Sequence, residues 1–364
     1  MCIRDRFCLV CITLPVFVHA GEVIQMAILL DTSGSMSGLI DQAKTQLWKI
    51  VNELAMAKKN GESPLLEVAL YEYGKDSLPA SEGYMRMIVP LTMDLDKVSE
   101  ELFKLTTNGG SEYCGEVIGK ASRELKWSGS NGDYKVIFIA GNEPFTQGEV
   151  DYRKTCPEAI AKGIIVNTIF CGDFNEGVST DWKAGAELAD GRYMNIDHNQ
   201  TAIHIDAPQD EELLQLGNEL NDTYIAYGIG GGELQERQEE QDINAASMSK
   251  SAAVERSVAK AQRMYVNSAW DMVDAVNNEG LDVTKLEEDQ LPEEMKGMTP
   301  EERDAYVSEM QGKRAELQEK INELNEERRE YIEKEMKKKA EENTLDTAII
   351  TAVRDQAVEK DYQF

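Results

Sequence analysis

Hydrophobic and polar positions between residues 23 and 227 alternate between two kinds of segment. Short runs rich in β-branched residues are separated by longer segments with apolar residues three or four positions apart. The strand-like runs are 24–30, 66–73, 85–91, 135–140, 164–170 and 192–196, and the helix-like segments are 40–58, 94–105, 112–126, 151–161, 181–189 and 210–226. This order predicts an α/β fold with a doubly wound, mostly parallel six-stranded sheet. Because no helix precedes 85–91, we expect an antiparallel edge strand there.

The pattern changes after residue 227. Residues 228–232 read Gly-Ile-Gly-Gly-Gly, the glycine density of a flexible joint, and no strand pattern follows them. An apolar seam within 254–276 predicts one helix or two, and the proline-containing stretch 281–298 is typical of a connector. Thr299-Pro300-Glu301-Glu302 supplies an N-cap, a proline at the first helical position and acids in the first turn. We therefore expect an all-helical region at 233–364.

A long charged helix is predicted from residue 300 to about 343. Val307, Leu317 and Ile321 lie on its apolar seam, but Arg314 and Arg328 interrupt that seam. Two interpretations stay open. The helix folds back on the 254–276 segment of the same chain, or it pairs with a second copy as a partial coiled coil and makes a homo-oligomer.

The first twenty residues have the pattern of a secretory signal peptide. The apolar run 7–18 contains a proline and is too short to span about 30 Å of hydrocarbon, and a small-residue cleavage pattern ends at Ala20. We expect an exported protein, periplasmic or extracellular, with no membrane span. The predicted organisation is a signal peptide at 1–20, an α/β domain at 21–227, a glycine linker at 228–232 and a helical acidic tail at 233–364.

The net charge excludes some classes of partner, and the cysteine spacing excludes a zinc site. Lys and Arg number 38 and Asp and Glu 67, for a formal charge of −29, which repels nucleic acids and anionic bilayers. Three cysteines follow residue 20, namely Cys114, Cys156 and Cys171, with no zinc-site spacing. Either one pair forms a disulfide or all three are buried thiols. We prefer a Cys156–Cys171 pair, because both are expected at one edge of the sheet.

Short oxygen-bearing side chains follow the first predicted strand. Asp31, Ser33 and Ser35 are spaced two apart in Asp-Thr-Ser-Gly-Ser, so that alternate side chains of an extended turn face one point. Ligands of doubly wound sheets bind at the carboxyl ends of the strands. One carboxylate and two hydroxyls suit a small hard cation. The alternative is a loop that only caps the following helix through Ser35 or Ser37.

This loop resembles the metal-ion-dependent adhesion site of von Willebrand factor A domains, as in integrin inserted domains. Asn-Gly-Gly-Ser at 108–111 is similar to the family's Gly-Gly-Thr loop, and 188–194 is similar to the family's segment before the last strand. The resemblance covers roughly 23–227 and implies the A-domain variant of the doubly wound fold. The whole chain also resembles exported bacterial members with a charged helical tail.

The resemblance implies a site for Mg²⁺ or Mn²⁺ held by Asp31, Ser33 and Ser35, with Ser111 in place of the family's threonine. The third loop departs, because Gly141 stands where the family usually has aspartate, and Asn142 or Glu143 is expected to supply an oxygen instead. In the family, the open coordination position takes a carboxylate from a protein partner. Two aromatic residues, Tyr113 and Phe145, are expected on the rim and are assigned to partner binding. The alternative is that both pack under neighbouring loops.

We expect a binding protein and no enzyme. No Gly-x-Ser-x-Gly motif is present, and His198 and His204 have no paired serine motif. The favoured function is metal-dependent binding of a protein ligand, as in adhesion or scaffolding, in the cell envelope. The alternative is a structural or oligomerisation protein that acts through its helical tail while its metal site is inactive.

Overall fold

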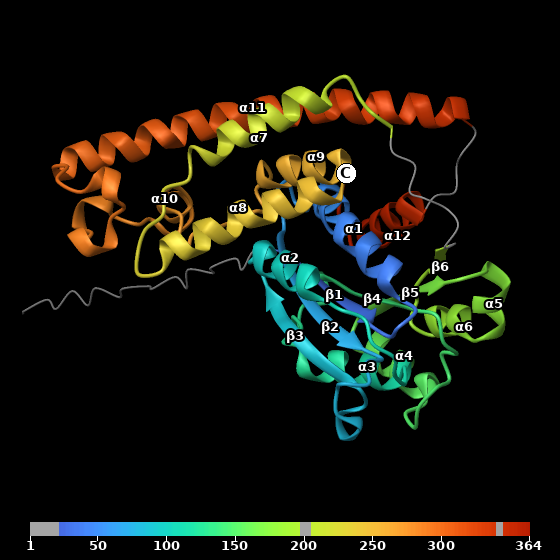
Figure 1. Ribbon diagram of the computed structural model, residues 1–364. Coiled ribbons are helices and arrows are strands. Elements are labelled where there is room, and N and C mark those ends of the chain that lie inside the picture. The colour runs from blue at the N-terminus through green and yellow to red at the C-terminus, as the bar shows by residue number, and fades with distance from the viewer. Residues whose placement is uncertain (1–21, 197–204, 340–344) are drawn as a thin grey trace, which may run out of the picture.

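The computed structural model describes residues 22–196, 205–339 and 345–364. Its strands are β1 (Val23–Asp31), β2 (Leu65–Tyr73), β3 (Met85–Thr92), β4 (Tyr134–Gly141), β5 (Ile164–Cys171) and β6 (Tyr193–Ile196). They form one sheet in the order β3-β2-β1-β4-β5-β6, in which only the β2–β3 pair is antiparallel (Figure 1). The predicted doubly wound sheet and its antiparallel edge strand are confirmed. The expected signal peptide lies outside the described residues.

Helices cover both faces of the sheet. The helices on one face are α1 (Ser37–Ala55), α2 (Leu95–Lys104) and α12 (Leu345–Val358), and those on the other are α3 (Cys114–Glu124), α4 (Tyr152–Ile160) and α6 (Trp182–Glu187), which follows the short α5 (Phe174–Ser179). Met26 and Ile28 of β1 pack under α1, whereas the alternate Ala27 and Leu29 pack toward α3. Both faces of β1 are apolar because both are covered.

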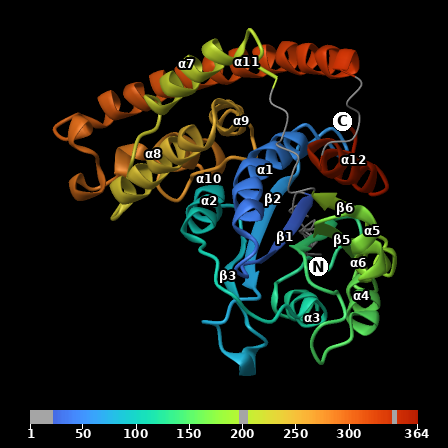
Figure 2. The same ribbon diagram turned by 45° about the vertical axis from the view of Figure 1, so that its right-hand side comes forward.

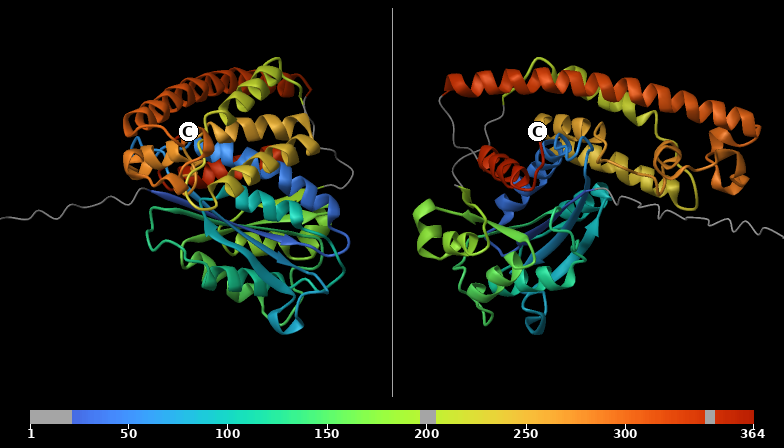
Figure 3. Two further views of the ribbon diagram at one scale, coloured as in Figure 1. Left: turned by 60° about the vertical axis from the view of Figure 1, so that its left-hand side comes forward. Right: turned by 180° about the vertical axis from the view of Figure 1, so that it is seen from behind.

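The remaining helices form a layer above α1 and α2. They are α7 (Asp210–Asn221), α8 (Gly231–Met248), α9 (Lys250–Lys260), α10 (Met272–Glu279) and α11 (Pro300–Lys339). Helix α11 lies along α7, and α8 and α9 lie between α11 and the sheet unit in every view (Figures 1 and 3). The predicted helical region after the sheet domain is therefore confirmed. None of the described helices combines the length and the apolar composition needed to cross a bilayer.

The last helix of the chain packs on the sheet unit. Helix α12 contacts α1 and β6 (Figure 2), and the Gln356 side chain bonds with Asn167 of β5 and accepts from the Tyr134 hydroxyl of β4 at 2.8 Å. Beyond α12, Tyr362 is buried and donates to the carbonyl of Val23. In contrast, α7, which was expected over the sheet, packs against α9 and α11. The segment 345–364 thus completes the core of the sheet unit.

The glycines at 228–232 start a helix. Gly231 and Gly232 are the first residues of α8, and the Gly228 amide donates to the carbonyl of Gln290 at 2.9 Å. Gly228 and Gly230 have φ of 76° and 87°, the left-handed region that favours glycine. Their conformational freedom therefore serves a tight turn that is held by hydrogen bonds.

The apolar seam of α11 faces its own chain. Val307, Leu317 and Ile321 are buried. Arg314, which interrupts the seam, is also buried, lies over the ring of Tyr224 and pairs with Asp271, and Arg328 pairs with Asp210 and Glu255. Of the two interpretations of this helix, packing within one chain is the one that the structure shows. The arginines hold the helix in place.

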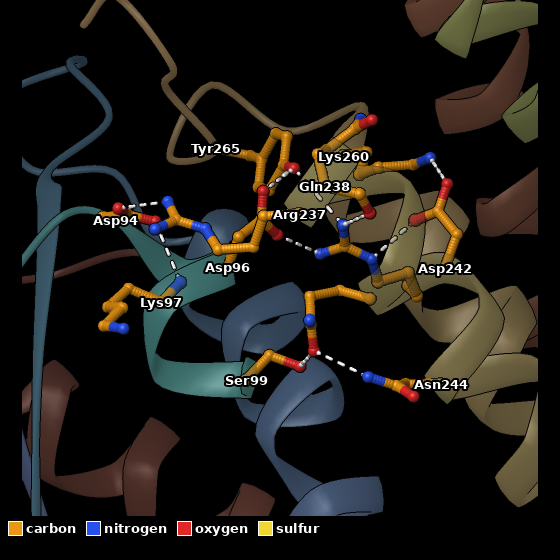
Figure 4. Close-up of polar contacts among 12 residues, drawn as sticks. Asp94, Asp96, Lys97, Ser99, Arg237, Gln238, Asp242, Asn244, Lys260 and Tyr265 are labelled. Carbon is orange, nitrogen blue, oxygen red and sulfur yellow. Dashed lines mark hydrogen bonds and ion pairs between the residues drawn. The ribbon is translucent and has the colours of Figure 1, made fainter. Parts of the chain in front are cut away.

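A buried network of charges joins the helical layer to α2. Arg256 of α9 pairs with Asp96 of α2 at 2.6 Å and with Asp242 of α8 at 2.8 Å, and its guanidinium lies over the Trp48 ring. Lys260 also pairs with Asp242, and Figure 4 shows these acids together with Tyr265, whose hydroxyl donates to Asp96. Although burial raises it, the pKa of Asp242 is lowered to about 2 by the charges of Lys260 and Arg256.

The preferred disulfide is wrong. Cys114, Cys156 and Cys171 are all buried, and none of them forms a disulfide. Cys156 lies in the core on the α3–α4 side of the sheet, whereas Cys171 points into the core under α1. The sheet itself therefore separates the two sulfur atoms.

Candidate metal site

The first loop of the site leaves the carboxyl end of β1. Asp31 is fully buried, and its Oδ1 accepts from the Ser33 amide at 2.7 Å, which folds the loop back on the carboxylate. The hydroxyls of Ser33 and Ser35 lie 3.4 Å apart. The three side chains that the spacing predicted to face one point are thus linked. Helix α1 begins after Met36, with no side-chain cap, so that the capping role considered for Ser35 is not seen.

Neighbouring strands fix this loop. The amide of Thr32 donates to the carbonyl of Tyr73 at 2.8 Å, and its hydroxyl lies 3.2 Å from a carboxylate oxygen of the buried Glu72. The Asn108 amide donates in turn to the carbonyl of Thr32 at 3.0 Å, which ties the second loop to the first. The site therefore sits where three segments of the chain meet at the carboxyl edge of the sheet.

The second loop brings in a residue that the sequence analysis missed. Ser111 is half-buried. The next residue, Glu112, is 4% exposed, and its carboxyl group shares a hydrogen bond with that of Asp31. Its amide donates to the side chain of Gln147, which fixes the turn before α3. The sequence feature that could have identified Glu112 is its position as an acidic residue directly after the expected serine.

The third loop contributes a neutral side chain. Asn142 donates to the Ser35 hydroxyl at 3.0 Å, whereas Glu143 is exposed and adds a nearby negative charge. Gly141 has no room for the family's aspartate, because a Cβ there would lie 2.6 Å from the Tyr73 hydroxyl. That hydroxyl donates to the carbonyl of Ala140 at 2.9 Å and is buried. The packing of Tyr73 against Gly141 therefore excludes the family's aspartate at this position.

Three acceptor oxygens at this point are buried and have no hydrogen-bond partner. They are Asp31 Oδ2, Glu112 Oε2 and Asn142 Oδ1. Buried acceptors without partners are costly, and hard divalent cations take such carboxylate and amide oxygens. In the described part of the chain, no three His, Cys, Asp or Glu side chains group as metal ligands, so a cation here would also need hydroxyls or water. The donor set fits Mg²⁺ or Mn²⁺.

The two carboxyl groups of the site disfavour each other's charge. Burial raises the pKa of Asp31 to about 6, and burial together with the Asp31 charge raises the pKa of Glu112 to about 9. Without a cation, one proton is therefore retained between the two groups at neutral pH. A bound divalent cation would replace this proton and compensate the charge of both carboxylates.

The aromatic residues expected on the rim differ from each other. Phe145 is 1% exposed and packs edge-on against Tyr152 and Trp182, so its assignment to partner binding is wrong. The short turn that follows Asn142 points the side chain of Phe145 into the core. Tyr113 is half-buried and lies edge-on to Tyr84, with ring centroids 5.7 Å apart. Its role in partner binding stays a prediction.

Comparisons with known proteins give matches only at the level of structure. No family model matches the chain, and no curated protein does so either. Conserved hypothetical protein BatB from Bacteroides thetaiotaomicron is 18% identical over 48% of this chain and 90% of its own, with a TM-score of 0.36. The SpRpn10 VWA domain is 16% identical over 48% and 88%, with a TM-score of 0.36.

A third similar structure is proximal thread matrix protein 1 from the mussel byssus with a zinc-occupied MIDAS motif. It is 11% identical over 48% of this chain and 42% of its own, with a TM-score of 0.35. The sheet order, its antiparallel edge strand and the Asp31-x-Ser33-x-Ser35 loop at its carboxyl edge give this chain a von Willebrand factor A-type fold, extended by a helical layer.

Proposed function

We propose that this protein binds a protein ligand through a divalent cation held at the carboxyl edge of the sheet. Asp31, Ser33 and Ser35 hold Mg²⁺ or Mn²⁺, Asn142 contributes an oxygen, and an open coordination position takes an oxygen of the partner, a carboxylate in the family pattern. The observation that carries the proposal is that two acceptor oxygens of this set, Asp31 Oδ2 and Asn142 Oδ1, are buried and have no hydrogen-bond partner. A cation would satisfy both at once.

The proposed setting is the cell envelope, periplasmic or extracellular, with adhesion or scaffolding as the role. The N-terminal export pattern and the net charge of −29, which disfavours nucleic acids, support this setting. The helical layer serves as a spacer or as a second docking surface. The buried seam of α11 is already occupied by its own chain, so a homo-oligomer would use other surfaces.

The test is calorimetric titration of Mg²⁺ and Mn²⁺ into the purified protein, its Asp31→Ala variant and its Asp41→Ala variant. Asp41 is an exposed acid of α1 and serves as the matched control. We expect saturable binding in the wild type and in Asp41→Ala, and none in Asp31→Ala. Equal binding in all three proteins would refute the proposed site. Capture of a partner in Mg²⁺ but not in EDTA, lost in Asp31→Ala, would then test the function.

A further inference from the structure

Glu112 is a buried acidic residue at the candidate metal site. Its side chain is 4% exposed, and its Oε2 atom has no hydrogen-bond partner. An isolated buried carboxylate is costly, so that a group in this position needs a proton or a cation. No lysine or arginine in the described part of the chain forms an ion pair with it.

The backbone of β2 makes room for this carboxylate beside Asp31. Gly74, directly after β2, has φ of 80°, and a Cβ there would lie 2.6 Å from Asp31 Oδ1 and 2.7 Å from Glu112 Cγ. The absence of a side chain at this position thus lets both acids approach the same point. They approach it from two loops that the Asn108–Thr32 hydrogen bond holds together.

We infer that Glu112 is a direct carboxylate ligand of the divalent cation, so that two carboxylates of the chain itself neutralise the ion. The inference rests on the proposed metal-dependent function and deepens it. In the A-domain pattern, the second loop supplies a hydroxyl ligand, which was expected from Ser111. Here the carboxylate of the next residue, Glu112, takes that position. Two carboxylates, Asp31 and Glu112, balance the two positive charges of Mg²⁺ or Mn²⁺.

This charge balance sets the order of assembly. A cation that needs a partner's carboxylate for neutrality binds weakly until the partner arrives. A cation already neutralised by Asp31 and Glu112 is retained by the protein alone, and the partner then adds one oxygen to a loaded site. The affinity for metal in the absence of any partner is therefore the quantity that distinguishes the two cases.

The experiment is calorimetric titration of Mg²⁺, repeated with Mn²⁺, into the purified protein and its Glu112→Gln, Glu124→Gln and Asp31→Ala variants. Glutamine keeps the shape of Glu112 and a hydrogen bond to Asp31 but removes the charge. Glu124 is an exposed acid at the far end of α3 and is the matched control. We expect Glu112→Gln to weaken metal binding about tenfold or more, and Glu124→Gln by less than about threefold.

A second measurement keeps the result interpretable. Thermal unfolding in EDTA at neutral pH should show Glu112→Gln to be at least as stable as the wild type, because glutamine keeps the packing and, like the protonated carboxyl group, donates a hydrogen bond to Asp31. Metal affinity should thus fall without a loss of metal-free stability, which the loss of a purely structural residue would not cause. If glutamine unfolds the protein, Glu112→Asp, which keeps the charge on a shorter side chain, should still bind Mg²⁺ more tightly than Glu112→Ser.

The outcomes separate the inference from the proposed function. If Asp31→Ala loses the metal while Glu112→Gln binds it as the wild type does, the inference is overturned and the metal site stands. Equal affinities of Glu112→Asp and Glu112→Ser would overturn it as well. If Asp31→Ala binds as tightly as the wild type, the metal site itself fails, and the role of Glu112 fails with it.

Discussion

Replacement of Arg256 by methionine tests whether the charge network holds the helical layer on the sheet unit. Arg256 is 1% exposed, and its loss would leave the equally buried Asp96 with only the Tyr265 hydroxyl, while Asp242 would keep Lys260. Methionine retains much of the stem that packs on Trp48. Removal of one partner of a buried ion pair costs about 3–5 kcal/mol, mostly because the remaining charge is uncompensated.

Urea unfolding followed by circular dichroism measures this loss as a fall in the midpoint at unchanged slope. The control is Arg192→Met, which removes an exposed pair with Asp355 and should cost less than about 1 kcal/mol. A double variant, Asp96→Asn with Arg256→Met, should recover part of the stability, since no charge is then left unpaired. If Arg256→Met and Arg192→Met destabilise equally, the network does not hold the two layers together, and the reasoning is refuted.

Three further predictions concern the site and the C-terminus. Gly141→Asp, which restores the family's aspartate, should lower the melting temperature and not raise Mg²⁺ affinity, because its Cβ would meet the buried Tyr73 hydroxyl at 2.6 Å. In EDTA, the contribution of Asp31 and Glu112 to stability should be complete below their ordinary pKa values of 3.8 and 4.5 and should be lost as pH rises toward about 6 and about 9, because the folded state raises both pKa values. Between pH 6 and pH 9 the melting temperature should therefore fall in EDTA but not in saturating Mg²⁺, as thermal melts across pH would show. Deletion of 345–364 should abolish cooperative unfolding in a calorimetric scan, because each fully buried apolar side chain on α12 contributes about 1.5–3 kcal/mol.

Each of these three predictions would be contradicted by a specific result. A Gly141→Asp protein with an unchanged melting temperature and tighter Mg²⁺ binding would show that the third loop can relax around aspartate. Melting temperatures in EDTA that stay level or rise between pH 6 and pH 9 would contradict the raised pKa values of Asp31 and Glu112. A protein without 345–364 that unfolds as sharply as the full chain would show that α12 is dispensable.

The sheet and the first metal loop were predictable because both depend on local sequence. The alternation of Met26 and Ile28 with Ala27 and Leu29 marks a strand covered on both faces, whatever covers it. The spacing of Asp31, Ser33 and Ser35 works within one turn, so no distant contact is needed to bring the side chains together. The antiparallel edge strand and the position of the loop followed from those patterns.

Features that depend on distant contacts were not predictable. The choice between Ser111 and Glu112 depends on which side chain turns inward before α3, and Gly74, directly after β2, leaves the room for Glu112. Phe145 was misplaced for the same reason, because its partner Trp182 comes from a helix that follows β5. Likewise, Arg314 interrupts an apolar seam in sequence, but its ion-pair partner Asp271 lies just before α10, far away in the chain.

The position of α12 has a consequence for the timing of folding. The apolar face of β6 and α1 stays uncovered until residues 345–364 are available, since Ile349, Val353 and Tyr362 bury that face and Tyr362 bonds to the distant Val23. Contacts between residues far apart in sequence form late and slow the folding reaction. While the chain is being synthesised, the sheet unit therefore exposes an apolar, aggregation-prone face until α12 has emerged, and a chaperone that shields this face would act during that interval.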